Sequence, residues 1–308
     1  MVQVIVLGAA AGGGFPQWNS LGPNCARARA GDPATPSLTQ TSLAVSAGDG
    51  NWFLLDAAPE LRIQIERTPA LHPRQSPRHS PIQGVVLTSA DVDRIAGLLT
   101  LREGQPLSLY ATPRVHAVLD ANPVFEVLNR EKVARLPLAL DVAQPLVPPS
   151  GPARLQVTPF AVPGKVPLWL EGPGPVETGA LSEDVIGLEI AEIGGGKRLV
   201  YMPGCAMITA EIRARAAGAD LLFLDGTLWQ DDEMVRAGIG PKTGRRMGHV
   251  SMSGPDGSIA GLASVSGPTR YFIHINNSNP VLARDSAERQ ELEAAGWHVA
   301  EDGMIIDL

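Results

Sequence analysis

An apolar run, a polar turn and a second apolar run follow one another directly in residues 84–99, and this order constrains the fold more than any other feature. Residues 84–87 are rich in β-branched residues and leucine, which predicts a buried strand. Residues 88–89 can then cap a helix whose apolar residues recur at helical spacing. Asp91 and Asp93 therefore lie between the end of a strand and the first turn of a helix. Open α/β sheets place their functional residues at such strand ends.

The two carboxylates of this turn allow two interpretations. Asp91 and Asp93 repel each other at this spacing unless a cation lies between them, which favours a bound ion or a basic side chain. Alternatively, both are first-turn carboxylates that the helix dipole stabilises. The spacing alone leaves both interpretations open.

The composition excludes several classes of protein. The chain has 308 residues, of which 44% are hydrophobic and 19% charged, enough for one large or two medium domains. The net charge of −7 and a pI of about 5.4 argue against nucleic acid as a partner. No stretch of about 18 apolar residues is present, so we expect no membrane span.

The N-terminal region predicts a strand and a reducing compartment. Residues 2–7 are a hydrophobic run without a preceding basic segment, so we interpret them as a first strand rather than a signal peptide. The glycine-rich residues 8–14 are only a weak signal for a dinucleotide site, because residues 15–19 do not open a helix. The cysteines are Cys25 and Cys205, and a chain with so few cysteines favours a cytoplasmic location.

The hydrophobic pattern predicts strands that alternate with short helices. A β-rich opening followed by strand–helix units occurs twice, so we expect one domain over residues 1–308 with pseudo-duplicated halves. The expected strands are 2–7, 41–46, 52–56, 84–87, 107–111, 155–160, 185–193, 198–202, 221–224 and 270–275. The expected helices are 60–66, 113–119, 125–133, 209–217, 258–263 and 284–296, and the expected loops are 19–38, 72–81 and 162–169.

Polar side chains follow several predicted strands, and strand ends of one sheet converge. Carboxylate and imidazole are the usual ligands of iron, zinc and manganese, and two histidines with one carboxylate suit a non-haem Fe(II) site that uses O₂. A single histidine at a strand end is more often a hydrogen-bonded structural residue, so only the conjunction supports a metal site. The groups are Asp91, Asp93, Cys205, Asp225 and His274 at strand ends, with His249 in a loop.

Several longer segments carry a resemblance to a known family. The chain resembles, over essentially its whole length, the PqqB family of pyrroloquinoline quinone (PQQ) biosynthesis within the metallo-β-lactamase superfamily. The resemblance implies an α/β fold, a four-layer αββα sandwich of two packed mixed sheets flanked by helices, with the site at the sheet edges. The matching segments are 7–19, 99–104, 225–234, 243–249 and 274–280.

The chain departs from the metal motif of this superfamily, His-x-His-x-Asp-His. Ser89 and Asp91 stand where its first two histidines stand, Asp93 matches its aspartate, and Arg94 replaces its last histidine. A guanidinium group has no lone pair to donate, so Arg94 cannot be a ligand. It can instead pair with Asp91 and Asp93 and take the electrostatic role of a cation.

A second departure concerns a structural zinc. Many members of the family hold this zinc with three cysteines, and only Cys25 remains here, with Ser20 and Gly22 in the other positions. A single thiolate cannot form a closed zinc site, so we predict that this zinc is absent and that packing holds the loop.

The resemblance implies an iron-dependent hydroxylase. Its substrate would be the crosslinked Glu-Tyr precursor of PQQ, whose tyrosine ring is hydroxylated with O₂ before other PQQ-pathway enzymes act. His249 would orient the substrate or carry protons, and Arg94 would bind a substrate carboxylate or tune the metal. The presence of Arg94 at a ligand position weakens this prediction.

The same resemblance implies the metal ligands. Asp93 and His274 would hold Fe(II), and Asp91 or Asp225 would complete the coordination.

Two other functions remain open. A non-catalytic protein that binds PQQ or its precursor, or carries it toward the periplasm, would need basic contacts for a polyanionic ligand. A metallohydrolase would need two metals or a strongly activated water, which this motif supplies poorly. Candidate substrate contacts are Ser89, Arg94, Lys165, Lys242, Arg245, Arg246 and Asn276.

Overall fold

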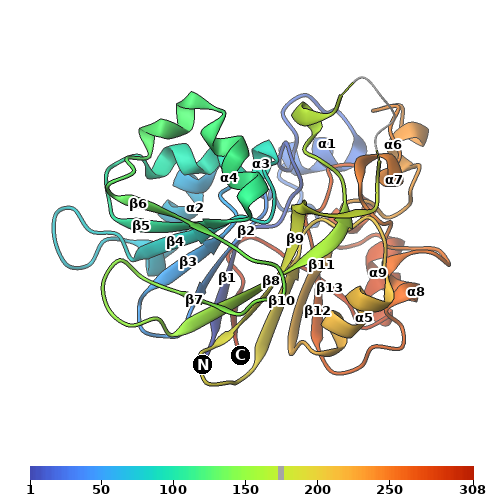
Figure 1. The fold of residues 1–308 in the computed structure, drawn as a ribbon. Coiled ribbons are helices and arrows are strands. Elements are labelled where there is room, and N and C mark those ends of the chain that lie inside the picture. The colour runs from blue at the N-terminus through green and yellow to red at the C-terminus, as the bar shows by residue number, and fades with distance from the viewer. Residues whose placement is uncertain (173–176) are drawn as a thin grey trace.

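Two mixed β-sheets of seven strands each pack face to face in the computed structural model, which describes residues 1–172 and 177–308 (Figure 1). Helices cover the outer face of each sheet (Figure 1). This arrangement confirms the predicted α/β, four-layer αββα sandwich.

The first sheet has the order β14 (Ile305–Asp307), β1 (Gln3–Gly8), β2 (Ser42–Ser46), β3 (Trp52–Leu55), β4 (Ile82–Val86), β5 (Leu107–Ala111) and β6 (Val133–Pro137). The second has the order β13 (His298–Val299), β12 (Thr269–Ile273), β11 (Leu221–Asp225), β10 (Arg198–Met202), β9 (Ala180–Glu192), β8 (Leu155–Gly164) and β7 (Gln144–Leu146).

The inner strands are apolar on both faces because both faces are covered. In β4, Val86 packs into the core between the sheets, whereas Val85 packs into the outer core beneath the helices. Successive side chains of a strand point to opposite faces, so a strand with two covered faces is a continuous apolar run.

The α-helices are α1 (Pro23–Arg29), α2 (Leu61–Arg67), α3 (Val92–Ile95), α4 (Pro113–Asp120), α5 (Ala210–Ala217), α6 (Glu233–Arg236), α7 (Gly244–Met247), α8 (Ser258–Gly261) and α9 (Ala287–Ala294). Short 3₁₀ helices are Pro69–Leu71, Ala96–Leu101, Pro123–Val127, Leu168–Leu170 and Pro280–Leu282.

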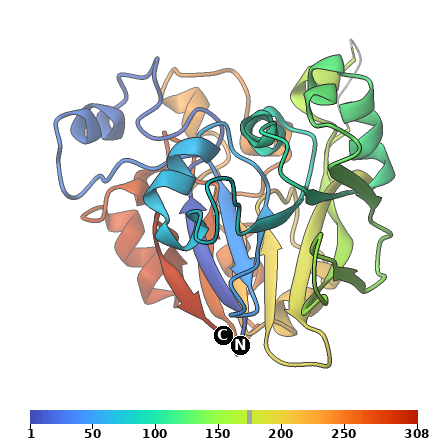
Figure 2. The ribbon, with the colours of Figure 1, turned by 90° about the vertical axis from the view of Figure 1, so that its left-hand side faces the viewer.

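The chain crosses from one sheet to the other and returns at its end. Strands β1–β6 lie in the first sheet, β7–β13 lie in the second, and β14 comes back to pair antiparallel with β1. The two termini therefore lie side by side at one rim of the sandwich (Figures 1 and 2). Helices α3 and α7 lie at the opposite rim (Figure 1). The prediction of one domain with pseudo-duplicated halves stays a prediction.

Three sequence predictions differ from the structure. Residues 19–38 contain α1, where Pro23 occupies the first turn, a position at which a missing N–H costs nothing. The expected helix 125–133 is only a 3₁₀ turn, because Val133 begins β6 and pairs with Leu107 of β5. The expected loop 162–169 begins within β8, where a bulge between Ala161 and Pro163 accommodates proline in the strand.

The turn after β4 is held close to the first sheet. The main chain of Ala57 donates to the carbonyl of Arg94 and accepts from Gly97, at 2.8 and 2.9 Å. A Cβ atom on Gly97 would come within 2.2 Å of the Ala58 carbonyl oxygen, so only glycine fits there. This close packing fixes the position of α3 and of the residues that precede it.

Both cysteines are buried thiols. The Cys25 sulfur lies 3.7 Å from the Asn277 side-chain oxygen, so the N-terminal loop packs against the segment after β12. Burial raises the pKa of Cys205 to about 12, which makes it an unreactive thiol. The absence of the structural zinc stays a prediction, and zinc analysis of the wild type and of Cys25→Ala is its test.

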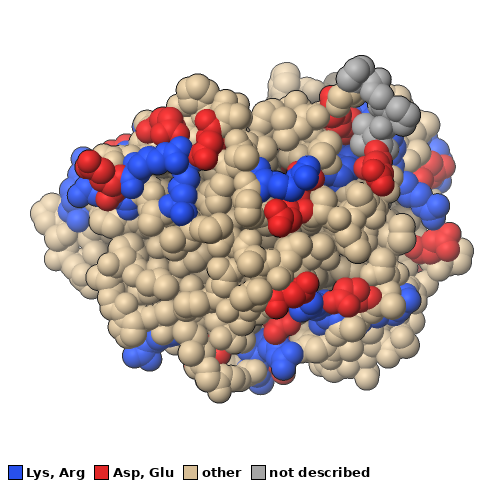
Figure 3. Space-filling model, in the orientation of Figure 1, with Lys and Arg blue, Asp and Glu red and all other residues tan. Residues whose placement is uncertain are grey.

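Acidic and basic side chains lie intermixed on the face that Figure 3 shows, with no continuous basic patch on that face. Within residues 1–172 and 177–308, no helix is long and apolar enough to cross a membrane.

Candidate functional site

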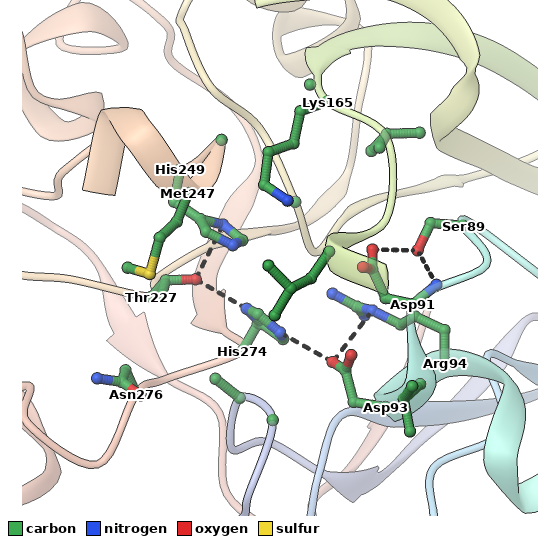
Figure 4. Close-up of a pocket in the computed structure, with 18 of the residues that line it drawn as sticks. Ser89, Asp91, Asp93, Arg94, Lys165, Thr227, Met247, His249, His274 and Asn276 are labelled. Carbon is green, nitrogen blue, oxygen red and sulfur yellow. Dashed lines mark hydrogen bonds and ion pairs between the residues drawn. The ribbon is translucent and has the colours of Figure 1, made fainter. Parts of the chain in front are cut away.

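A cavity of about 420 Å³ lies at the rim where the ends of the two sheets meet. Asp91 and Asp93, which follow β4, line one side of it, and His249 and His274 from the second half of the chain line the other (Figure 4). Lys165, which follows β8, forms a third wall (Figure 4). The predicted convergence of distant strand ends therefore occurs.

A buried carboxylate that the sequence analysis did not identify anchors the first wall. Asp56 follows β3 directly, with the unusual φ of 63°, and its side chain is fully buried. The Thr88 main-chain N–H and hydroxyl donate to its two oxygens at 2.8 Å each, and the Tyr201 hydroxyl donates at 3.0 Å. Burial raises the pKa of Asp56, although the positive charge of Arg94 offsets part of this effect.

Arg94 is held by groups from both sheets. Its side chain is almost completely buried, and its Nη1 lies 3.1 Å from Asp56 Oδ2. Nη2 donates to the carbonyl of Pro203, after β10, at 3.1 Å. Its Nε lies 3.6 Å from Asp93 Oδ2 (Figure 4). The guanidinium group is therefore a fixed cation between the sheets.

This geometry corrects the predicted pairing of Arg94 with both Asp91 and Asp93. The contact with Asp93 is present but long, and Asp91 instead accepts a hydrogen bond from the Ser89 hydroxyl at 2.8 Å. The physical reason is Asp56, a fully buried carboxylate that needs the guanidinium more than partly exposed Asp91 does.

A continuous hydrogen-bonded chain links the two walls. His274 Nε2 lies 3.1 Å from Asp93 Oδ2, and its Nδ1 lies 2.8 Å from the Thr227 hydroxyl (Figure 4). That hydroxyl lies 2.6 Å from Asp225 Oδ1, and Asp225 Oδ2 lies 2.6 Å from His249 Nδ1. Five groups from both halves of the chain therefore form one hydrogen-bonded relay.

The charges along this relay are coupled. Burial disfavours the ionised form of Asp93, but the hydrogen bond with His274 and the charge of Arg94 outweigh burial and lower its pKa. Burial and Arg94 lower the pKa of His274, which favours its neutral imidazole. Burial opposes ionisation at both Asp225 and His249, yet their mutual attraction lowers the pKa of the acid and raises that of the histidine.

A possible metal-binding triad lies within this relay. Asp225, His249 and His274 each offer one ligand atom, and these atoms lie within 4.8 Å of one another. The Thr227 hydroxyl lies among them, 3.1 Å from His249 Nδ1 and 2.8 Å from His274 Nδ1. Asp225 Oδ1 and the Nδ1 atoms of both histidines are therefore already hydrogen-bonded to a side chain.

The iron set implied by the sequence does not fit these residues. A non-haem iron site takes two histidines and one carboxylate. Here Asp93 and His274 lie together, and the Arg94 guanidinium, which cannot donate a lone pair, lies beside them. The predicted third ligand, Asp91 or Asp225, does not join these two, because the three candidate ligand groups that lie within 4.8 Å of one another in the described residues are Asp225, His249 and His274.

Basic side chains surround one acidic group at the third wall. Lys165 Nζ lies 2.8 Å from Glu171 Oε1, and Arg246 lies 3.0 Å from Glu171 Oε2. Lys242 lines the cavity and lies 4.0 Å from the same carboxylate. Hydrogen bonds from Arg246 and Lys165 lower the pKa of Glu171 to about 2. The cluster retains an excess of positive charge.

Of the other predicted substrate contacts, some line this cavity and one lies on another surface. Ser89 and Asn276 line the cavity (Figure 4). Arg245 does not: it pairs with Asp256 at 3.2 Å beside a separate surface depression, so the prediction that Arg245 contacts the same ligand is not supported. The reason is that consecutive residues of α7 point in different directions.

Several site residues were missed by sequence reasoning. Asp56 is the last residue of one predicted strand and Asp225 directly follows another, and this shared place at a strand end was an available signal. Thr227 lies two residues beyond Asp225 in the same turn. Nothing in the sequence identifies Glu171, whose role depends on the packing of its loop against α7.

Comparisons with known proteins identify relatives along the whole chain. The profile of the Beta-lactamase superfamily domain matches residues 51–275. The coenzyme PQQ synthesis protein B of Gluconacetobacter diazotrophicus is 57% identical over 99% of both chains. That of Methylorubrum extorquens is 53% identical over the full length of both.

Solved structures agree with these matches. The structure of Zn²⁺-bound PqqB from Methylobacterium extorquens has a TM-score of 0.95 and 52% identity, over 99% of this chain and 100% of that one. A diphosphatase from the PhnP family has a TM-score of 0.68 at 19% identity, over 100% of this chain and 98% of that one, and shares the fold.

Proposed function

Because this chain belongs to the coenzyme PQQ synthesis protein B family, within the β-lactamase superfamily, we propose that its cavity binds the crosslinked Glu-Tyr precursor of PQQ or PQQ itself. The observation that supports this most is the meeting of basic and apolar groups in one cavity of about 420 Å³. Such a ligand is an aromatic polyanion, and it needs both kinds of contact.

The basic wall suits the carboxylates of the ligand. Lys165 and Lys242 face the cavity, and Glu171 currently satisfies part of their charge. A ligand carboxylate that approaches Lys165 would replace or extend the contact with Glu171. Charge-assisted hydrogen bonds of this kind are about twice as strong as neutral ones.

The apolar rim suits the ring. Val92, Leu168 and Trp169 line the cavity, and each is substantially exposed to solvent. The Trp169 indole N–H donates to the carbonyl of Ala90 at 3.2 Å, which holds the indole beside the cavity. Burial of a flat ring against these side chains would provide binding free energy and orientation.

The His249–Asp225 pair would position a proton beside the bound ligand. Asp225 accepts from His249 Nδ1, so the imidazole is oriented with Nε2 available. We propose that protonated His249, which Asp225 stabilises, donates a hydrogen bond from Nε2 to a ligand oxygen, whether the ligand is transformed here or passed to other enzymes of the pathway.

Calorimetric titration of PQQ tests this proposal. We expect binding at one site, and we expect Lys165→Ala to weaken it about tenfold or more, the effect of one lost charge-assisted contact. We expect Glu171→Gln to strengthen binding, because it removes the competing carboxylate. Arg245→Ala is the matched control and leaves binding unchanged. An unaltered affinity in Lys165→Ala would contradict the proposed wall.

Hydroxylation of the tyrosine ring with Fe(II) and O₂ is a second candidate. The observation in its favour is the contact of Asp93 with His274 at the cavity wall, and it would require a further ligand, Asp91 or Asp225. The test is anaerobic incubation with Fe(II) and the diamino acid, followed by O₂ and mass spectrometry. A product heavier by one oxygen atom supports this candidate, and its absence in iron-loaded protein rejects it.

A further inference from the structure

We infer that Arg94 is a built-in cation that takes the place of the catalytic metal ion, so that the cavity works without a metal. This inference concerns the chemistry of the cavity and does not depend on which ligand the cavity binds.

The first observation is how firmly the guanidinium is fixed. Arg94 is 4% exposed, and its nitrogens contact Asp56, Asp93 and the carbonyl of Pro203. The Tyr201 hydroxyl lies 3.4 Å from Nη1 and also donates to Asp56. A side chain held by so many partners cannot swing aside at low cost to admit an ion.

The second observation is the charge at the metal position. Asp93 Oδ2 contacts both His274 Nε2, at 3.1 Å, and Arg94 Nε, at 3.6 Å. An ion bound between Asp93 and His274 would therefore lie next to a permanent positive charge. The repulsion acts in a buried environment, where it is poorly screened.

The third observation is that the triad of Asp225, His249 and His274 offers no alternative metal site. The Thr227 hydroxyl occupies the space between Asp225 Oδ1 and the Nδ1 atoms of His249 and His274, at 2.6, 3.1 and 2.8 Å. Both Asp225 oxygens also accept main-chain hydrogen bonds, from Cys205 at 2.8 Å and from Thr227 at 3.0 Å. Metal binding there would break several buried hydrogen bonds.

The remaining groups are too few. Asp93 and His274 are two ligands, and within the described residues Asp91 does not form a group of three ligand atoms with them. Catalytic zinc takes three ligands from the protein, and non-haem iron takes two histidines and one carboxylate. Replacement of Arg94 by histidine would supply an imidazole and remove the charge in one step.

Metal binding to wild type, Arg94→His and Arg94→Met tests the inference. Each protein is treated with chelator, desalted and titrated with Zn²⁺, and anaerobically with Fe²⁺, against a competing dye. We expect no tight site in the wild type, about one ion per chain in Arg94→His at least about 100-fold tighter than any site in the wild type, and no gain in Arg94→Met, which removes the charge without adding a ligand.

Thermal unfolding supplies a second readout. We expect added Zn²⁺ to raise the Tm of Arg94→His and to leave the wild type and Arg94→Met unchanged. A tight stoichiometric site in the wild type that is lost in Asp93→Asn would overturn the inference. That measurement needs no Arg94 variant, so a failure of Arg94→His to fold does not remove the test. PQQ binding by the same metal-free wild type is measured separately. Its result tests only the proposed function.

Discussion

Replacement of Arg94 by methionine is expected to lower the free energy of unfolding by about 3–5 kcal/mol, the range seen when one partner of a buried ion pair is removed. Asp56 is fully buried, and Arg94 is its charged partner at 3.1 Å. Without the guanidinium, Asp56 must either stay charged in the core or take up a proton, and both states cost stability. Urea unfolding at pH 7, followed by circular dichroism, measures the loss.

Two further variants distinguish the effect of losing the buried ion pair on stability from the effect of changing the side chain's size. Asp56→Asn with Arg94→Met removes both charges and is expected to be more stable than Arg94→Met alone. Arg245→Met removes an arginine from an exposed pair, whose side chains are 66% and 80% exposed, and is expected to cost less than about 1 kcal/mol. Equal losses for the buried and the exposed arginine would contradict the role assigned to Arg94.

Replacement of Asp225 by alanine is expected to cost about 3 kcal/mol or more and to abolish PQQ binding. Its carboxylate accepts hydrogen bonds from the main chain of Cys205 and Thr227, from the Thr227 hydroxyl and from His249. Each buried donor left without a partner costs about 1–3 kcal/mol, and His249 loses the group that orients it. Urea unfolding and PQQ calorimetry measure the two effects.

Two variants control for this change. Asp232→Ala removes a carboxylate from an exposed pair with Arg236 and is expected to alter neither stability nor binding appreciably. Asp225→Asn keeps the shape and one acceptor, so it is expected to fold better than Asp225→Ala while still binding PQQ more weakly than the wild type. Full PQQ affinity in Asp225→Asn would mean that the charge of Asp225 does not orient His249.

The layered fold was predictable because strands and helices that are buried on known faces have a recognisable pattern of apolar residues in the sequence. Residues 84–87 form a continuous apolar run because Val85 and Val86 face two different cores. Strand β6 was not predictable in this way, because only its pairing with β5 makes a strand of residues 133–137. Helix α1 was missed since its short sequence contains a proline and one buried residue, Cys25.

The site was predictable only in part. The approach of Asp93 to His274 was predictable, because strand ends converge and the family resemblance assigns both residues to one site. The true partner of Arg94 was not, because Asp56 lies 38 residues away and only the packing of α3 onto the end of β3 brings the two together. The place of the Thr227 hydroxyl among three ligand groups likewise depends on side-chain directions that no spacing rule gives.

Titration of PQQ into protein freed of metal by chelation tests the central claim most directly. If Arg94 supplies the positive charge that an ion would otherwise provide, the metal-free and untreated samples should bind PQQ with the same affinity, within roughly twofold or about 0.4 kcal/mol. Binding that disappears on chelation and returns with added Fe²⁺ or Zn²⁺ would contradict the claim.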